Sequence, residues 1–105
     1  MNKTARKYIF LADDDEDDCL LFEDALREVS ASTALTMAND GVELMTILDN
    51  LIPPPPDVIF LDLNMPRKNG FECLAEIRSS RTLKDIPVVI FSTTGEEEAI
   101  DRLYE

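Results

Sequence analysis

The chain of 105 residues contains no histidine, and this absence removes several kinds of chemistry. Without an imidazole, the chain cannot supply a serine–histidine–aspartate triad, a histidine metal site or a phosphohistidine of its own. Cysteine is scarce as well, because Cys19 and Cys73 are the only two in the sequence. Thiols stay reduced in a cytosolic protein, so we expect both to be free.

Long apolar runs and excess positive charge are also missing. No run approaches the roughly 20 apolar residues of a membrane span, and no signal-peptide core follows the basic start, MNKTARKYIF. Because 22 acidic residues face only 10 basic ones, the net charge is −12 and a nucleic acid would be repelled. We therefore predict one small cytoplasmic domain over residues 1–105, with no membrane contact and no nucleic-acid partner.

Short apolar runs alternate with amphipathic stretches along the chain. The apolar runs predict four strands, at residues 7–12, 33–38, 57–61 and 86–91. The amphipathic stretches predict three helices, at residues 16–30, 42–52 and 70–80. The final stretch, 92–105, is expected to form a loop and then a fourth helix. This order is typical of the α/β class, with a doubly wound parallel sheet and helices on both faces.

The first amphipathic stretch shows its apolar stripe clearly. Leu21, Ala25 and Val29 recur at intervals of four residues, with Phe22 and Leu26 beside them. This spacing places them on one side of a helix, which we expect to face the core.

Polar groups follow three of the predicted strands. Asp13 and Asp14 come after the first strand, Asp62 and Asn64 after the third, and Ser92 after the fourth. The carboxyl ends of parallel strands share one edge of the sheet, where α/β proteins bind their ligands. If these strands are neighbours, three carboxylates meet and repel one another. Mg²⁺ would relieve that repulsion, because it prefers oxygen ligands.

Asp62 then has a possible chemical role. A carboxylate can act as a nucleophile towards a phosphoryl group and form an aspartyl-phosphate. A metal ion would neutralise the phosphoryl oxygens, and the hydroxyl of Ser92 would contact them.

Three segments, LADDDEDD, FLDLNMPRKNGFECLAEIR and IPVVIFST, resemble the CheY-like receiver domain of two-component response regulators. The similarity runs from about Tyr8 to the last residue. It implies a flavodoxin-like sheet with strand order 2-1-3-4. It also implies a role for each of the polar residues that follow the strands.

On this resemblance, Asp13 and Asp14 are the family's acidic pair, and Asp62 is the phosphoacceptor. Asn64 lends its main-chain carbonyl to the metal, and Ser92 contacts the phosphoryl group. The ligands of Mg²⁺ (or Mn²⁺) would be Asp14, Asp62 and the Asn64 carbonyl, with Asp13 acting through a water.

The resemblance further implies a signalling role rather than an enzymatic one. The chain would accept a phosphoryl group from a sensor histidine kinase or a phosphotransfer protein, and would assist its own phosphoryl transfer and dephosphorylation. Phosphorylation would pull the loop at residues 92–98 inward. The altered surface would then bind a downstream effector protein or a second receiver.

The match to the family is incomplete at the carboxyl-terminal end. The family's fifth strand, which carries a lysine, and its fifth helix are expected to be absent from residues 1–105. The chain would then be a fragment, part of a longer protein, or one member of an assembly in which a partner covers the open edge. The strand at 87–91 would have one unpaired edge, which favours a homodimer.

Two other functions remain open on the sequence. Asp13 and Asp15 have the spacing of the nucleophile and acid in haloacid-dehalogenase-like phosphatases, which would make the chain an enzyme. Alternatively, the chain is a receiver-shaped interaction module that no longer takes phosphate. The missing lysine supports this second alternative, whereas the intact acids argue against it.

Overall fold

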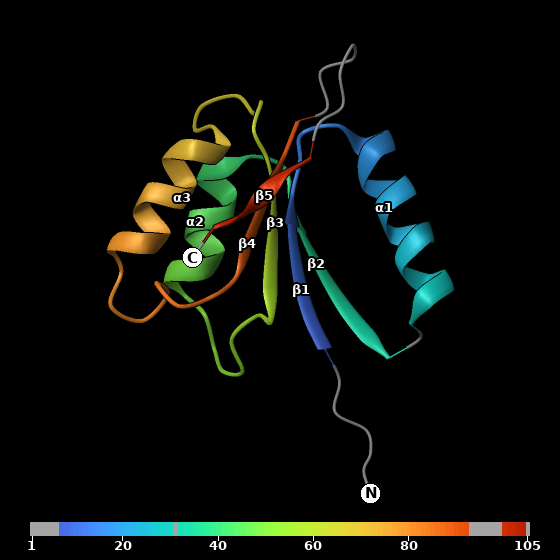
Figure 1. Cartoon of the computed structure of the whole chain (residues 1–105), viewed down its shortest axis with the longest axis horizontal. Helices are drawn as coiled ribbons and strands as arrows, with labels where there is room; N and C mark the ends of the chain where they lie inside the picture. The colour runs from blue at the N-terminus through green and yellow to red at the C-terminus, as the bar shows by residue number, and fades with distance from the viewer. Residues whose placement is uncertain (1–6, 31, 93–99, 105) are drawn as a thin grey trace, which may run out of the picture.

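The computed structural model describes residues 7–30, 32–92 and 100–104 (Figure 1). Its strands are β1 (Lys7–Ala12), β2 (Thr33–Ala38), β3 (Val58–Asp62), β4 (Val88–Phe91) and β5 (Ile100–Tyr104). Its helices are α1 (Glu16–Val29), α2 (Gly41–Asp49) and α3 (Gly70–Ser79). Each of these helices is too short or too polar to cross a lipid bilayer.

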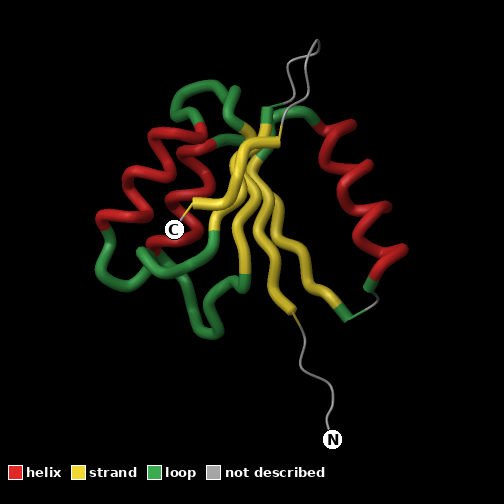
Figure 2. Tube along the Cα trace, viewed as in Figure 1, coloured by secondary structure: helices red, strands yellow, loops and turns green. Residues whose placement is uncertain are grey.

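The described strands form one sheet in the order β2-β1-β3-β4-β5 (Figure 2). β1 is parallel to both β2 and β3, and β3 is parallel to β4. The predicted parallel order 2-1-3-4 is thus confirmed. The chain crosses from one side of β1 to the other between β2 and β3, and α/β proteins place their sites at this kind of switch point.

Helices cover the two faces of the sheet unequally. α2 and α3 lie together on one face, whereas α1 is the only described helix on the other (Figure 1). The main core includes Leu44 and Leu48 of α2, Cys73 and Ile77 of α3, and Ile59 of β3. Most of the buried apolar core therefore lies between the sheet and the α2–α3 pair.

The face beneath α1 is less completely filled. Two grooves of about 300 and 280 Å³ run between α1 and the sheet, and Phe22 lines both. Leu21 and Val29, which were expected to face the core, are 66% and 78% exposed. That expectation is wrong because a single helix covers only part of a sheet face that is several strands wide.

The carboxyl-terminal segment also differs from the expectation. Residues 100–104, predicted in a fourth helix, form β5, which pairs antiparallel with β4. Val89 lies opposite Leu103 and Phe91 opposite Ile100, with a shift in register between Val89 and Phe91. An apolar edge strand offers unpaired N–H and C=O groups, and this pairing outweighs the helix preference of a short segment. The predicted open edge of β4 is therefore wrong, and so is the homodimer argument based on it.

Both thiols lie inside the protein. Cys19 and Cys73 are buried and free. Burial raises the pKa of each to about 11, so both stay protonated at neutral pH. Cys19 donates to the carbonyl of Asp13 at 3.6 Å, and Cys73 donates to that of Gly41 at 3.7 Å.

Two glycines allow helices to approach the loop that follows β3. A Cβ atom added to Gly70, the first residue of α3, would lie 2.8 Å from the carbonyl oxygen of Asp62. A Cβ atom added to Gly41, the first residue of α2, would lie 2.2 Å from the carbonyl oxygen of Lys68. Both helices therefore begin in direct contact with the backbone of this loop.

Replacing Gly41 by alanine is expected to destabilise the fold. The new methyl group would overlap the backbone carbonyl oxygen of Lys68, which cannot turn aside as the end of a flexible side chain would. We expect a loss of about 1–3 kcal/mol in the free energy of unfolding, measured by urea denaturation. The control is Thr46→Ala at an exposed position of α2, where a change within about 1 kcal/mol is expected. Equal stability of the two variants would contradict this steric argument.

Candidate functional site

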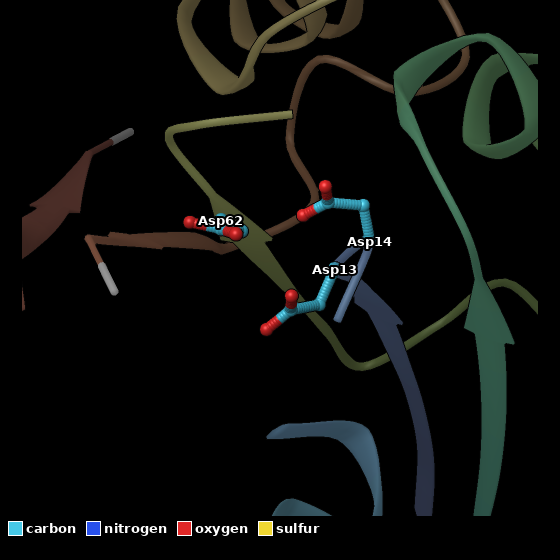
Figure 3. Close-up of side chains that lie close together, drawn as sticks. All are labelled: Asp13, Asp14 and Asp62. Carbon is cyan, nitrogen blue, oxygen red and sulfur yellow. The ribbon is translucent and has the colours of Figure 1, made fainter. Parts of the chain in front are cut away.

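Three carboxylates converge at the carboxyl ends of β1 and β3. Asp13 and Asp62 are each 1% exposed, whereas Asp14 is exposed. One oxygen from each carboxylate lies within 4.8 Å of the other two (Figure 3). The structure therefore brings together the three acids that the sequence predicts to meet.

The sheet register explains this convergence. Ala12 of β1 pairs with Leu61 of β3, so the next residues, Asp13 and Asp62, lie at the same level at the carboxyl ends of the two strands. Ala38, the last residue of β2, accepts a 3.1 Å hydrogen bond from the amide of Asp13. The parallel sheet alone thus fixes the backbone on which both buried acids stand.

Asp13 is held both by its neighbours and by its own side chain. Its Oδ1 accepts a 2.9 Å hydrogen bond from the amide of Asp15. Burial raises the pKa of Asp13 from 3.8 to about 7, and the negative charge of Asp62 adds to that rise. The Asp15 amide opposes the rise. In the metal-free protein, Asp13 is therefore partly protonated near neutral pH.

Asp62 begins the loop that leads to α3. Its Oδ1 accepts a 3.2 Å hydrogen bond from the amide of Asn64. The amide of the next residue, Leu63, donates a 2.7 Å hydrogen bond to the carbonyl of Phe91. The carbonyl of Leu63 accepts a 3.2 Å hydrogen bond from the amide of Gly70. The backbone on the carboxyl side of Asp62 is thus tied to both β4 and α3.

Ser92 and Asn64 meet beside this carboxylate. The side-chain amide of Asn64 donates to Oγ of Ser92 at 3.3 Å, across 28 residues of sequence. All five predicted site residues therefore lie at one end of the sheet. The loop movement predicted for residues 92–98 falls mostly outside the described residues, which resume at Ile100.

The donor set fits a small divalent cation. Asp13, Asp14 and Asp62 offer only oxygen atoms. Burial is the main cause of the raised pKa of Asp13, and the negative charge of Asp62 adds to it. Mg²⁺ and Mn²⁺ both accept carboxylate, carbonyl and water ligands. No sulfur or nitrogen ligand joins this cluster among the described residues, so softer metals are not favoured.

Asp15 serves a different purpose from its neighbours. It caps the start of α1, where its Oδ1 accepts hydrogen bonds from the amides of Asp17 at 2.9 Å and Asp18 at 3.3 Å. A side chain used as a helix cap is poorly placed to act as an acid beside Asp13. This observation weakens the phosphatase alternative.

Sequence reasoning missed one ion pair close to this site. Arg67, in the loop after β3, donates from Nε at 3.0 Å and from Nη2 at 2.6 Å to Oδ2 of Asp40. The amide of Glu43 donates to the other oxygen of Asp40, which caps α2. These bonds lower the pKa of Asp40, the Glu43 amide having the largest effect. The two residues are 27 positions apart in the sequence, so no local sequence pattern predicts that they pair.

A family model described as the response regulator receiver domain matches residues 9–105. The chain belongs to this family. It is therefore a receiver domain of two-component signal transduction, as its parallel sheet and its three gathered carboxylates indicate. The haloacid-dehalogenase interpretation is accordingly set aside.

Named relatives agree with this membership. The chain is 36% identical over 103 residues to the response regulator Rcp1 of Synechocystis sp., and the match covers 94% of this chain and 70% of that protein. It is 39% identical over 69 residues to the response regulator RR06 of Streptococcus pneumoniae, covering 66% of this chain and 29% of that protein. The chain thus spans less than a third of RR06.

Solved structures share the fold. The phosphorylated cyanobacterial phytochrome response regulator RcpA matches with a TM-score of 0.78 and 42% identity, covering 88% of this chain and 69% of that one. The Mn²⁺-bound form of Rcp1 matches with a TM-score of 0.75 and 38% identity, covering 87% of this chain and 68% of that one. A similar protein has thus been seen phosphorylated, and another with a divalent cation.

The raised pKa of Asp13 predicts an unusual pH dependence for the metal-free protein. Below pH 7 the folded state binds a proton that the unfolded state has already released above pH 3.8. Stability from this group is therefore greatest at acidic pH and is lost as pH rises towards 7. At about 1.4 kcal/mol per pH unit for one proton, we expect a loss of about 2 kcal/mol between pH 5 and pH 7.5.

Asp13→Asn provides the control for this pH dependence. Urea denaturation in a chelator should give wild-type protein that loses more stability than the variant between these two pH values. The difference between the two proteins removes the effects of the groups that titrate independently of Asp13. Parallel pH profiles would show that Asp13 does not hold its proton in the folded state.

Proposed function

We propose that Asp62 is the phosphoacceptor of this receiver and that Asp13, Asp14, Asn64 and Ser92 assist it. The observation that supports this role most strongly is the 4.8 Å grouping of three carboxylates at the ends of β1 and β3. Asp62 stands at the carboxyl end of β3, where a partner's phosphoryl group could approach it. Residues 1–105 are proposed to lack the family's usual lysine-bearing strand and last helix.

The metal proposed for this site is Mg²⁺, with Mn²⁺ as a substitute. Asp14 and Asp62 would hold it by carboxylate oxygens, Asn64 by its main-chain carbonyl, and Asp13 through a bridging water. A divalent cation, when bound, supplies the positive charge that neutralises phosphoryl oxygens. The close grouping of three carboxylates supports this assignment, as does the contribution of the Asp62 charge to the raised pKa of Asp13.

The proposed reaction moves a phosphoryl group from a phosphohistidine onto Asp62. A carboxylate oxygen of Asp62 forms the new P–O bond while the P–N bond of the donor breaks. The imidazole leaves with the electron pair and takes a proton from water. Oγ of Ser92 donates a hydrogen bond to a phosphoryl oxygen, which turns Ser92 away from its contact with Asn64.

The partners follow from this chemistry. The donor is a sensor histidine kinase or a phosphotransfer protein in the cytoplasm, since the chain has no histidine of its own. The phosphoryl group adds a charge of roughly −1.5 to −2, and movement of Ser92 would carry the following loop towards it. A downstream effector protein or a second receiver would bind the altered surface.

One observation favours a receiver that no longer takes phosphate. Among the described lysine side chains, Lys68 pairs with Glu76 of α3, whereas Lys7 begins β1 and Lys84 precedes β4, both at the opposite end of the sheet. None of these three lysines follows β5, where the family's lysine is expected. Measured phosphorylation of Asp62 decides between the two functions.

Metal binding is expected to depend on Asp14. Asp14→Asn removes one carboxylate from an exposed position, so the fold should be unaffected, and calorimetric Mg²⁺ affinity should fall at least about tenfold. The control is Asp17→Asn, which removes the same charge from the first turn of α1. If both variants bind Mg²⁺ equally well, the cation is held by general acidity and not by this site.

Phosphorylation is expected to require Asp62. Incubation with Mg²⁺ and a radiolabelled, phosphorylated sensor kinase should label the wild-type chain and leave Asp62→Asn unlabelled. Asp85→Asn makes the same change in the turn before β4 and should be labelled at the wild-type rate. A small acyl phosphate serves as a second donor that needs no kinase docking. Equal labelling of Asp62→Asn would assign the acceptor elsewhere.

A further inference from the structure

We propose that Arg67 and Asp40 act as a pair of positioning residues that fix the loop between Asp62 and α3. In doing so, they set how tightly the site holds a divalent cation. The inference rests on the proposed function, because it concerns the same cation. Neither residue belongs to the group that would touch the metal.

The contact is a two-point interaction with a largely buried partner. Both Nε and Nη2 of Arg67 donate to Oδ2 of Asp40, at 3.0 and 2.6 Å. The carboxylate of Asp40 is only 12% exposed, whereas the Arg67 side chain is 61% exposed. A planar guanidinium that donates twice defines an orientation that a single ammonium contact cannot. The loop is thus held at Arg67 in both position and direction.

The backbone of Arg67 has an unfavourable conformation that needs support from its surroundings. Its φ angle is +67°, in a region that side-chain-bearing residues rarely occupy. The amide of Lys68 donates to the carbonyl of Pro66 at 2.6 Å, which closes a three-residue γ-turn centred on Arg67. Such conformations persist where the surrounding structure over-determines them, and they concentrate at functional sites. The Asp40 carboxylate supplies the restraint here.

The start of α2 presses against the next residue of the same loop. Gly41 approaches Lys68 so closely that an added Cβ atom would lie 2.2 Å from its carbonyl oxygen. Asp40 therefore cannot shift relative to the loop without moving the whole first turn of α2, which it also caps. The ion pair and this backbone contact together fasten the loop to α2.

The fastened residue lies a short distance from the proposed metal ligand. Arg67 follows Asn64 by three residues, a reach of about 10 Å at most, and the intervening Met65 is buried in the core. At the Asp40 end of the pair, the carbonyl of Ala38 accepts a hydrogen bond from the amide of Asp13, and Asp40 follows Ala38 by two residues. The pair therefore links the backbone that carries Asp13 to the backbone that carries the Asn64 carbonyl.

The spacing between Asp13 and the Asn64 carbonyl therefore depends on the Arg67–Asp40 ion pair, which does not itself touch the metal. Groups that orient metal ligands from outside typically change affinity by about 10–100-fold when they are removed. Without the pair, the loop could relax about Arg67 and carry the Asn64 carbonyl out of place. Phosphoryl transfer to Asp62 would slow for the same reason.

The test compares two replacements of Arg67 in the full chain. Arg67→Gly accepts a positive φ without strain but has no guanidinium, and Arg67→Lys keeps the charge without the two-point contact. We expect both to weaken the binding of Mn²⁺, followed by electron paramagnetic resonance, by about tenfold. The thermal midpoint of Arg67→Gly should stay near that of the wild type. A merely structural residue would show the reverse pattern, with a lower midpoint and unchanged affinity.

A double-mutant cycle with Asp40→Asn supplies the second measurement. The asparagine keeps a side-chain oxygen for the Glu43 amide, so α2 remains capped. If the two residues act as one unit, the double variant binds Mn²⁺ no more weakly than either single variant. Without metal, hydrogen exchange at the Lys68 amide should also be faster than in the wild type. We expect this in Arg67→Gly, in Asp40→Asn and in the double variant, because the γ-turn at Arg67 is no longer anchored.

Arg81→Ala is the control, since Arg81 is exposed in the turn between α3 and β4. Wild-type Mn²⁺ affinity in Arg67→Gly, or multiplicative losses in the double variant, would overturn the positioning role alone. Failure of the wild-type chain to bind Mn²⁺ would overturn the metal assignment and this inference together. Loss of affinity in Arg81→Ala equal to that in Arg67→Gly would show a general charge effect and also overturn the inference.

Discussion

The repulsion between Asp13 and Asp62 is the constraint around which this end of the molecule is organised. Parallel pairing of β1 with β3 places the two carboxylates at the same level, and both are almost fully buried. Two negative charges in such a position are unfavourable unless a proton or a cation separates them. In the metal-free protein a proton does so, because burial raises the pKa of Asp13 to about 7 and the negative charge of Asp62 adds to that rise. In the proposed function, the same carboxylates would serve as oxygen ligands of the cation once that proton leaves.

The surrounding structure keeps the two acids together despite this cost. The amide of Asp13 is bound to β2 and that of Leu63 to β4, so the strand ends cannot separate independently. The absence of a Cβ on Gly70 lets α3 begin against the backbone of Asp62. The main buried core also lies between the strands and α2 and α3. The side beneath α1 is looser, with a groove whose lining includes Asp13.

The sequence predicts the centre of this arrangement better than its margins. The apolar runs that end in Asp13 and Asp62 predict both the strands and the site, because a buried strand needs apolar residues and a carboxylate at its tip must face a polar region. The pairing of residues 100–104 with β4 was missed, since a short segment takes the structure that its neighbour offers. The exposure of Leu21 was missed because helical periodicity shows which residues share a face, but not how much of that face is covered. The Arg67–Asp40 pair joins two loops that are distant in sequence, and only the folded chain reveals it.

Charge gives the proposed function a definite order of events. The chain carries a net charge of −12, and a phosphoryl group would add roughly two more negative charges beside three carboxylates. A negatively charged donor is therefore repelled until a cation occupies the site, so cation binding should precede phosphoryl transfer. Linkage requires the converse as well: if the cation favours the phosphorylated state, phosphorylation tightens cation binding by the same factor. Any residue that alters the spacing of Asp13, Asp62 and the Asn64 carbonyl acts on both equilibria at once. The loop after β3 is short and anchored at several points, which suits the proposed site, where the same oxygens would serve a proton, a cation and a phosphoryl group in turn.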